Sequence, residues 1–419
     1  MNGLWHWNFQ NFRKKIWFPI TIFGILGVLT AVAAVALKPL VPADLPELIG
    51  SESVSTLLNI LASSMLAVTT FALSIRFSAF AAATSSATPR ATVLLKDDAV
   101  TRSVLATFTG AFIFSLSGII GLQTGIYERS GRLILFVVTI LVIAAVVWQL
   151  VRWIGHLSDF GRLYDTMERL EKAASSSLSA RMARPYLGGR SAGPDLTERR
   201  AAGVALYAPC IGYVQFIDMP ALQACAKAAE VEVALTALPG TFVHPGAELL
   251  RVLAPTMPKG LTEDLLDSYA YGNNRTFDQD PRFGLVVLAE VASRALSPAV
   301  NDPGTAIDIL TRQHRILSLW QNHPDNEVLF DRLIVESLAI ADLFGDAFGP
   351  IARDGAGVIE VQTRLQKTLF ALALADPAEF LAPARQQSAR AVTLAKAALV
   401  VEEDKARLSA MQAQIEALA

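Results

Sequence analysis

Residues 277–310 read FDQDPRFGLVVLAEVASRALSPAVNDPGTAIDIL, the densest run of polar residues among apolar ones in this chain. Its two Asp-Pro pairs, at 280–281 and 302–303, are typical of helix starts. Aspartate caps the free amides of a first turn, and proline is tolerated at the next position because it lacks an amide hydrogen. Pro298 disfavours helical backbone at the residue before it, which ends the first helix. The stretch therefore predicts two helices joined by a turn, from Pro281 to near Leu296 and from Pro303 to near Leu319.

The turn between these two helices gathers polar residues at one corner. They are Arg294, Ser297, Asn301, Asp302 and Thr305. In one interpretation their side chains satisfy backbone groups of a capped helix–turn–helix. In the other, the corner is a ligand or ion site, or it docks on the membrane part of the chain.

Length and composition place this motif in a larger context. The chain has 419 residues, which leaves room for two or three domains. Its hydrophobic fraction of 53% is high and indicates membrane spans. A net charge of −2 gives no indication of nucleic-acid binding. The two cysteines, Cys210 and Cys225, match neither a disulfide framework nor a metal cluster.

The first 156 residues carry four apolar segments long enough to cross a bilayer. They are Ile16–Leu37, Val54–Ile75, Val104–Tyr127 and Leu133–Val151. The remaining chain mixes short β-type runs with helical ones. The sequence therefore predicts a mostly α membrane protein, in which a four-helix transmembrane bundle is followed by an α+β cytoplasmic domain.

Basic residues predict the orientation of these spans. Three of them, Arg13, Lys14 and Lys15, precede the first span, whereas the loop after that span is rich in acids. The second loop is basic again, and only the short third loop opposes the trend. Cytoplasmic loops carry an excess of lysine and arginine. We therefore expect a multi-pass protein of the bacterial inner membrane with both termini in the cytoplasm.

The second span carries a stripe of polar residues at helical spacing. The stripe consists of Thr56, Asn59, Ser63, Thr70 and Ser74. It either bonds within a helix bundle, including to its own backbone, or lines a water-filled path in an oligomer. No ionisable residue lies in the middle of a span, which argues against a proton-coupled transporter. In the third span Gly110, Gly118, Gly121 and Gly125 predict close helix approach.

The hydrophobic period changes along the rest of the chain and predicts four parts. They are a transmembrane domain (1–156), a membrane-proximal helix and linker (157–200), a small β-rich module (201–256) and a helical cytoplasmic domain (257–419). The β-rich module has four short apolar runs separated by Pro and Gly turns. The last helix, from about Pro383 to the end, has a three-four apolar spacing that suits packing or a seam between subunits.

The order of spans, the loop SSATPRATVLLKDDAV and above all RALSPAVNDPGTA resemble the bacterial membrane proteins grouped as domain of unknown function twenty-two fifty-four. The resemblance covers nearly the whole chain and implies four spans followed by a cytoplasmic domain. Its core pattern falls on Arg294–Pro298 and Asn301–Ala306, and Gly304 departs from the bulkier residue of that pattern. The family carries no established activity, so the resemblance implies an architecture and leaves function open.

No enzyme signature accompanies the architecture. The sequence contains no phosphate loop, HExxH, nucleophile elbow or paired-cysteine site. We therefore predict no catalytic residues, no metal site and no cofactor. The expected partners are the lipid bilayer, further copies of the chain, and an ion or small ligand, with no nucleic acid. Two functions are open: an oligomeric channel-like protein with a cytoplasmic regulatory domain, or a membrane-anchored sensor or scaffold that binds a small ligand or protein partner.

Overall fold

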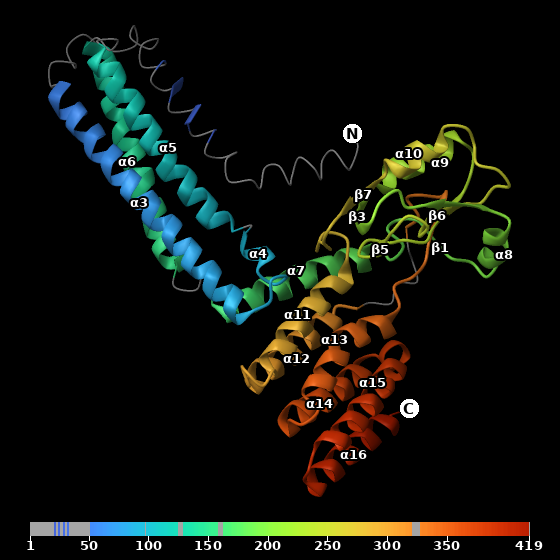
Figure 1. Ribbon diagram of the computed structural model, residues 1–419. Helices are drawn as coiled ribbons and strands as arrows, with labels where there is room; N and C mark the ends of the chain where they lie inside the picture. The colour runs from blue at the N-terminus through green and yellow to red at the C-terminus, as the bar shows by residue number, and fades with distance from the viewer. Residues whose placement is uncertain are drawn as a thin grey trace. The chain divides into compact units, whose positions relative to one another are not determined.

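The computed structural model describes residues 51–418, apart from positions 97, 125–128, 158–161 and 321–326, and six isolated positions between 21 and 32. The chain divides into two compact units (Figure 1). The membrane unit consists of the described residues up to Ser86 together with Thr92–Thr166. The C-terminal unit consists of Met167–Ala419 and the short segment Ala87–Ala91. The predicted span Ile16–Leu37 lies almost entirely outside the described residues.

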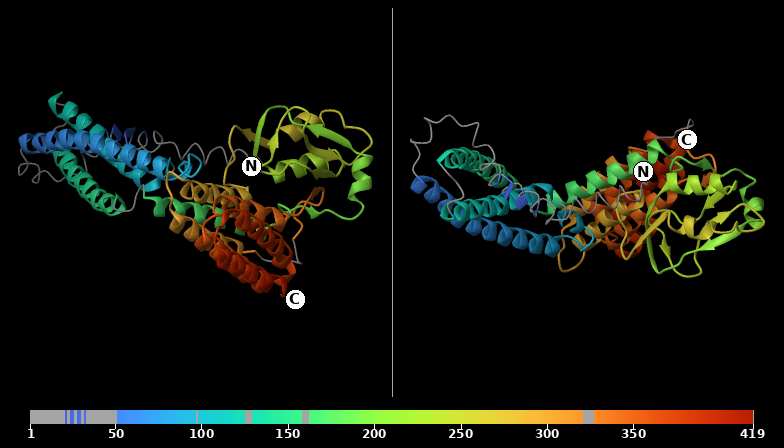
Figure 2. Two further views of the ribbon diagram at one scale, coloured as in Figure 1. Left: turned by 60° about the horizontal axis from the view of Figure 1, so that its bottom comes forward. Right: turned by 90° about the horizontal axis from the view of Figure 1, so that it is seen from above.

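Three long helices lie side by side in the membrane unit (Figures 1 and 2), with a short helix α4 (Val93–Lys96) between the first two of them in sequence. The long helices are α3 (Ser51–Ser86), α5 (Ala99–Gln123) and α6 (Arg129–Leu157). At about 1.5 Å of rise per residue, each exceeds a hydrocarbon core about 30 Å thick. Each contains a segment apolar enough to cross a membrane. Large apolar side chains on their outer faces are exposed, for example Phe71, Val147 and Val151, which suits contact with lipid.

Glycine allows α5 to lie close against α3. Gly110, Gly118 and Gly121 are buried, as the predicted close approach requires. A Cβ added at Gly118 would lie 2.9 Å from Cδ1 of Leu58, nearer than real Cβ contacts allow. The fourth glycine of the prediction, Gly125, lies outside the described residues.

The C-terminal unit contains two sheets that share one hydrophobic core. The larger sheet has the strand order β1-β8-β4-β6-β2, with β8 parallel to both of its neighbours and the other pairs antiparallel. The smaller, antiparallel sheet has the order β5-β3-β7. The strands are β1 (Arg190–Ser191), β2 (Val204–Tyr207), β3 (Gly212–Ile217), β4 (Val233–Leu235), β5 (Phe242–Val243), β6 (Glu248–Val252), β7 (Tyr269–Gly272) and β8 (Leu333–Val335).

Helices make up the rest of the C-terminal unit. Three short helices, α8, α9 and α10, accompany the sheets, and the longer ones pack together (Figure 1). The bounds are α7 (Leu163–Ala183, of which the residues from Met167 on belong to this unit), α8 (Leu196–Ala201), α9 (Met219–Ala228), α10 (Leu261–Leu266), α11 (Pro281–Ala295), α12 (Pro303–Leu317), α13 (Ile340–Asp354), α14 (Ile359–Ala375), α15 (Pro377–Ala398) and α16 (Glu402–Glu416). The two helices predicted from the opening stretch are confirmed as α11 and α12, and each is capped by its aspartate.

Two local expectations from the sequence were wrong. The part predicted to be helical (257–419) is not purely helical, because it contains β7 and β8. Strand β7 belongs to the smaller sheet and β8 to the larger one. The run at β8 is only three residues long, too short to show a period of two. The last predicted helix is two helices, with Leu399 extended between them. Asp376 and Pro377 start the first of them, six residues before the predicted start at Pro383.

Helix α7 is held tightly against the helical layer. A Cβ added at Gly284 of α11 would lie 2.8 Å from Cα of Ala174 on α7, so the two helices touch backbone to backbone. Three residues further back, Glu171 accepts hydrogen bonds from Arg312 (Nη1, 2.7 Å) and Arg315 (Nε, 2.6 Å) of α12. The Arg312 side chain is only 3% exposed. Position and orientation of α7 are therefore fixed by contacts on two helices.

Candidate ligand-binding site

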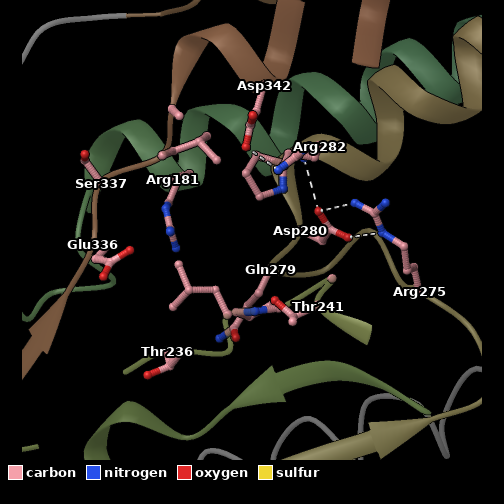
Figure 3. A pocket seen from close by; sticks show the side chains of 16 residues that line it. Arg181, Thr236, Thr241, Arg275, Gln279, Asp280, Arg282, Glu336, Ser337 and Asp342 are labelled. Atoms are coloured by element: carbon pink, nitrogen blue, oxygen red, sulfur yellow. Dashed lines mark hydrogen bonds and ion pairs between the residues drawn. The ribbon is translucent and has the colours of Figure 1, made fainter. Parts of the chain in front are cut away.

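A cavity of about 540 Å³ opens within the C-terminal unit (Figure 3). Four separate segments line it: the end of α7, the loop between β4 and β5, the segment leading into α11, and the segment between β8 and α13. Its volume lies in the range typical of small-molecule pockets, about 300–1,000 Å³. Neither histidine nor cysteine is among its lining residues, all of which the structure describes.

Arg181 of α7 is the unusual residue of this cavity. Its side chain reaches into the open space (Figure 3), yet the residue is only 4% exposed. Its Nε and Nη1 make no hydrogen bond with any described residue. Burial lowers the pKa of Arg181 to about 10, against a weaker opposing effect of Asp280, so the guanidinium stays protonated at neutral pH. The fold thus holds a cation with unused donors at the edge of a cavity.

The other arginines of the cavity are paired with acids. Arg275 donates two hydrogen bonds to the carboxylate of Asp280, from Nε (2.7 Å) and Nη2 (3.0 Å). Arg282 contacts two acids of α13, Asp342 (2.6 Å) and Asp346 (2.6 Å). Hydrogen bonding to Asp346 raises the pKa of Arg282. These ion pairs give the cavity a firm polar wall on one side.

Asp280 joins this wall to the start of α11. Its carboxylate accepts hydrogen bonds from the amides of Arg282 and Phe283, both at 3.2 Å, and thereby caps the helix. Gly240 lies directly against it, with a positive φ of 94°. A Cβ added at Gly240 would lie 2.9 Å from Oδ1 of Asp280 and closer still to Oδ2. Glycine is required at this position for two reasons. The backbone of any other residue would be strained at this φ, and its Cβ would displace the carboxylate of Asp280.

The predicted corner after α11 is a separate place, built of local hydrogen bonds. Asp302 accepts bonds from the amide (3.1 Å) and hydroxyl (2.5 Å) of Thr305, and Ser297 donates to the carbonyl of Arg294 (2.7 Å). Asn301 adopts a positive φ of 53°, a conformation that asparagine tolerates better than most residues. The five residues thus lie together, as expected. A ligand role for the corner stays a prediction, because the bonds seen there serve the backbone turn.

The polar stripe of the second span lies on one exposed side of α3. All five residues are exposed among the described residues. Three of the hydroxyls bond to their own helix, from Thr56 to the carbonyl of Glu52 (2.8 Å), Ser63 to that of Asn59 (2.9 Å) and Thr70 to that of Leu66 (3.0 Å). These bonds satisfy the hydroxyls without another helix. A water-filled path along the stripe stays a prediction.

The sequence analysis did not single out Arg181. The sequence nevertheless contained an indication of its burial, because Arg181 continues a pattern of small and apolar residues at every third or fourth position of α7. The buried residues of that pattern are Met167, Leu170, Ala174, Ser177 and Arg181. An arginine that continues a stripe of small and apolar residues is a candidate for a buried charge. Arg275 and Arg282 carried no comparable signal, since they flank the helix start.

Residues 13–371 match the family described as Predicted membrane protein (DUF2254). The chain belongs to this family. The match spans the described helices of the membrane unit, both sheets and every residue that lines the cavity. The resemblance seen in the sequence is thereby confirmed.

Individual relatives extend the comparison over a shorter stretch. An uncharacterized protein of Mycobacterium tuberculosis is 37% identical over 115 residues, which is 26% of this chain and 22% of the relative. An uncharacterized protein of Mycobacterium bovis matches with the same identity and coverage. The chain thus matches less than a quarter of the length of these relatives. No solved structure matches the chain.

Proposed function

We propose that this member of the DUF2254 family is a membrane-anchored receptor whose C-terminal unit binds a small ligand in the Arg181 cavity. The single observation that carries the proposal is the buried guanidinium of Arg181, which has unused donors at a cavity of ligand size. A buried charge without a partner destabilises a fold by several kcal/mol unless something neutralises it. A ligand that supplies the missing acceptor is the natural partner.

Two features of the surroundings support binding rather than catalysis. The cavity acids are already engaged in ion pairs with arginines, Asp280 with Arg275 and Asp342 with Arg282. The cavity also has firm walls, so its shape exists before a ligand arrives. With the basic-residue distribution of the sequence, we place this unit and both termini in the cytoplasm, next to the bacterial inner membrane.

A ligand screen on the full chain in detergent tests the receptor. The thermal midpoint is measured with small molecules that are neutral, cationic or anionic. We expect at least one class to raise the midpoint of the wild type by several degrees, because a ligand that binds only the folded state stabilises it.

Matched variants place that effect in the cavity. Ser337→Trp puts a bulky ring among the lining residues and should abolish the shift. Val400→Trp adds the same ring at a position that is 88% exposed and outside the cavity, and should leave the shift intact. A screen without any shift, or a shift that survives in Ser337→Trp, would contradict the receptor.

The exposed stripe on α3 favours a second candidate function, an oligomeric channel-like protein with a regulatory domain. Polar side chains on a face turned toward lipid are unfavourable, and a water-filled path between copies would relieve this. Single cysteines at Ser63 and Thr70, in a chain with Cys210 and Cys225 replaced by alanine, should then react with water-soluble thiol reagents in membranes. Cysteines at Leu66 and Leu73 should not. Equal protection from the reagent at all four positions would contradict a water-filled path. The stripe would then serve only helix packing and hydrogen bonding to its own backbone.

A further inference from the structure

The helical layer of the C-terminal unit carries a second hollow, of about 280 Å³, which shares no lining residue with the Arg181 cavity. Its lining residues come from α14 and from two helices that pack against α14, namely α12 and α16 (Figure 1). We call it the α14 hollow. Apart from Ile307, Ile359 and the buried Thr363, every lining residue is charged. The chemistry of the hollow is therefore that of its charges.

Three of the lining side chains are cations. Arg364 and Lys367 are three positions apart on α14, so they lie on one face of that helix, and Arg407 comes from α16. All three residues are exposed, so a dissolved ligand can reach their charged groups. Glu360 is the one acid that lines the hollow. Three cations and one acid give the lining a net charge of 3 − 1 = +2.

None of these three cations forms an ion pair with a described residue, Glu360 included. Other exposed arginines of the same unit do have acid partners. Arg190 contacts Glu232 and Arg353 contacts Asp354, both at 2.6 Å. Like charges at neighbouring positions of a helix face repel each other. An anion bound among the three cations would remove this repulsion.

The start of α14 adds to the positive field of the hollow. Ile359 and Glu360 are the first two residues of this 17-residue helix, and the side chain of its N-cap residue, Val358, makes no capping hydrogen bond. A helix N-terminus carries a partial positive charge that stabilises anions. An anion in the hollow is therefore favoured by the dipole of α14 as well as by the three cations.

The net charge and the size of the hollow indicate the kind of anion. A singly charged anion would leave half of the net charge of +2 unbalanced. An anion with two or three charged groups can contact the cations of α14 and of α16 at the same time. The volume of about 280 Å³ is close to the lower end of the usual range for small-molecule pockets, about 300–1,000 Å³, so the anion is small.

We infer that the α14 hollow binds a small anion with two or three oxyanion groups, which joins α14 to α16 through Arg364, Lys367 and Arg407. Guanidinium and ammonium groups both bind such oxyanions. The site goes beyond the proposed receptor, because it is separate from the Arg181 cavity. The number of negative charges on the ligand determines its affinity for the hollow.

Titration calorimetry on the full chain in a non-ionic detergent tests the inference with three carboxylates that share one benzene ring. Benzoate carries one carboxylate, isophthalate two and trimesate three, and benzoate is measured by competition against trimesate. We expect trimesate to bind about 10-fold more tightly than benzoate, with isophthalate between them. This difference corresponds to about 1.4 kcal/mol, which two further exposed ion pairs supply. Equal affinities, or no binding of trimesate, would overturn the inference.

Variants at exposed positions link the affinity to the hollow. Arg407→Gln should weaken trimesate binding by about 3- to 10-fold, as expected for the loss of one exposed charged contact. Glu360→Gln should strengthen it by about 2- to 5-fold, because it removes the acid that repels the anion. Arg390→Gln is the matched control, since Arg390 is exposed on α15 and lies outside the hollow. It changes the net charge of the chain as Arg407→Gln does, and should leave the affinity unchanged.

The variants also distinguish a site from general attraction between charges. Equal weakening in Arg407→Gln and Arg390→Gln would overturn the site, and so would weaker binding in Glu360→Gln. Ser337→Trp blocks the receptor cavity and should leave trimesate affinity unchanged; a loss in this variant would place the anion in the other cavity. The ligand screen for the receptor uses singly charged anions, so failure of one proposal leaves the other standing.

Discussion

Replacing Gly284 by alanine is expected to lower the free energy of unfolding by about 3 kcal/mol, the upper part of the range for overpacked cores. The new methyl group would lie 2.8 Å from Cα of Ala174 and nearer still to its Cβ. The backbone of α7 cannot move aside as the end of a flexible side chain could. Helices α7 and α11 must therefore separate, and buried contacts along both are weakened.

Gly345 of α13 is a matched control for this variant. It is also a helical glycine, but a Cβ added there meets nothing within 4 Å. Gly345→Ala should stabilise the protein by about 0.4–1 kcal/mol, because alanine restricts the unfolded chain and favours helix. Urea unfolding followed by circular dichroism measures both variants. Equal effects of the two substitutions would show that α7 and α11 are not in backbone contact.

Replacing Glu171 by alanine is expected to destabilise the protein by about 3 kcal/mol, because it removes a partner of a buried charge. Arg312 would lose its contact with Glu171 and keep the one with Asp308 (2.8 Å), and Arg315 would lose its bidentate partner. Glu402→Ala is the control, since Glu402 pairs with Lys405 on α16 while 81% exposed. Exposed pairs contribute less than about 1 kcal/mol. The same urea unfolding distinguishes the two.

The pH dependence of this effect has a definite sign. Hydrogen bonding from Arg315, and then the charges of Arg315 and Arg312, hold the pKa of Glu171 below its ordinary value despite some burial. A lowered folded-state pKa stabilises the fold above the unfolded-state pKa, and the stabilisation is lost as pH falls through the folded-state pKa. The stability gap between wild type and Glu171→Gln should therefore be full at neutral pH and shrink in acid. A gap that grows in acid would exclude the ion pair as its cause.

Local chemistry made the helical parts of this fold predictable. Asp280-Pro281 and Asp302-Pro303 each carry a cap and a helix-compatible proline, so α11 and α12 begin where the sequence indicates. The membrane helices follow from long apolar runs, which need no knowledge of neighbours. The pairing of β8 with β4, almost one hundred residues away in sequence, is a long-range contact that cannot be predicted from a three-residue run.

The cavity was harder to predict for the same reason. Its wall comes from four segments spread between Arg181 and Asp342, and of these only the start of α11, with Asp280 and Pro281, belongs to a short motif that the sequence shows. From the sequence alone, Gly284 is only a residue of low helix propensity. The close contact with Ala174 of α7 explains why a glycine occupies this helical position. The residues that the sequence did single out, around Asp302, form a local turn, because local patterns report local structure best.

Helix α7 carries the ion-paired Glu171, the close contact at Ala174 and the cavity residue Arg181. Glu171 and Arg181 are ten positions apart, about 15 Å along the helix axis. The helix begins at Leu163, soon after α6 ends at Leu157. Because Glu171, Ala174 and Arg181 lie on one continuous helix, a displacement of α7 as a body would move all three. Thermodynamic linkage then works in both directions. If the proposed ligand binds in the cavity, a displacement of α7 that changes its affinity is in turn favoured by ligand occupancy by the same factor.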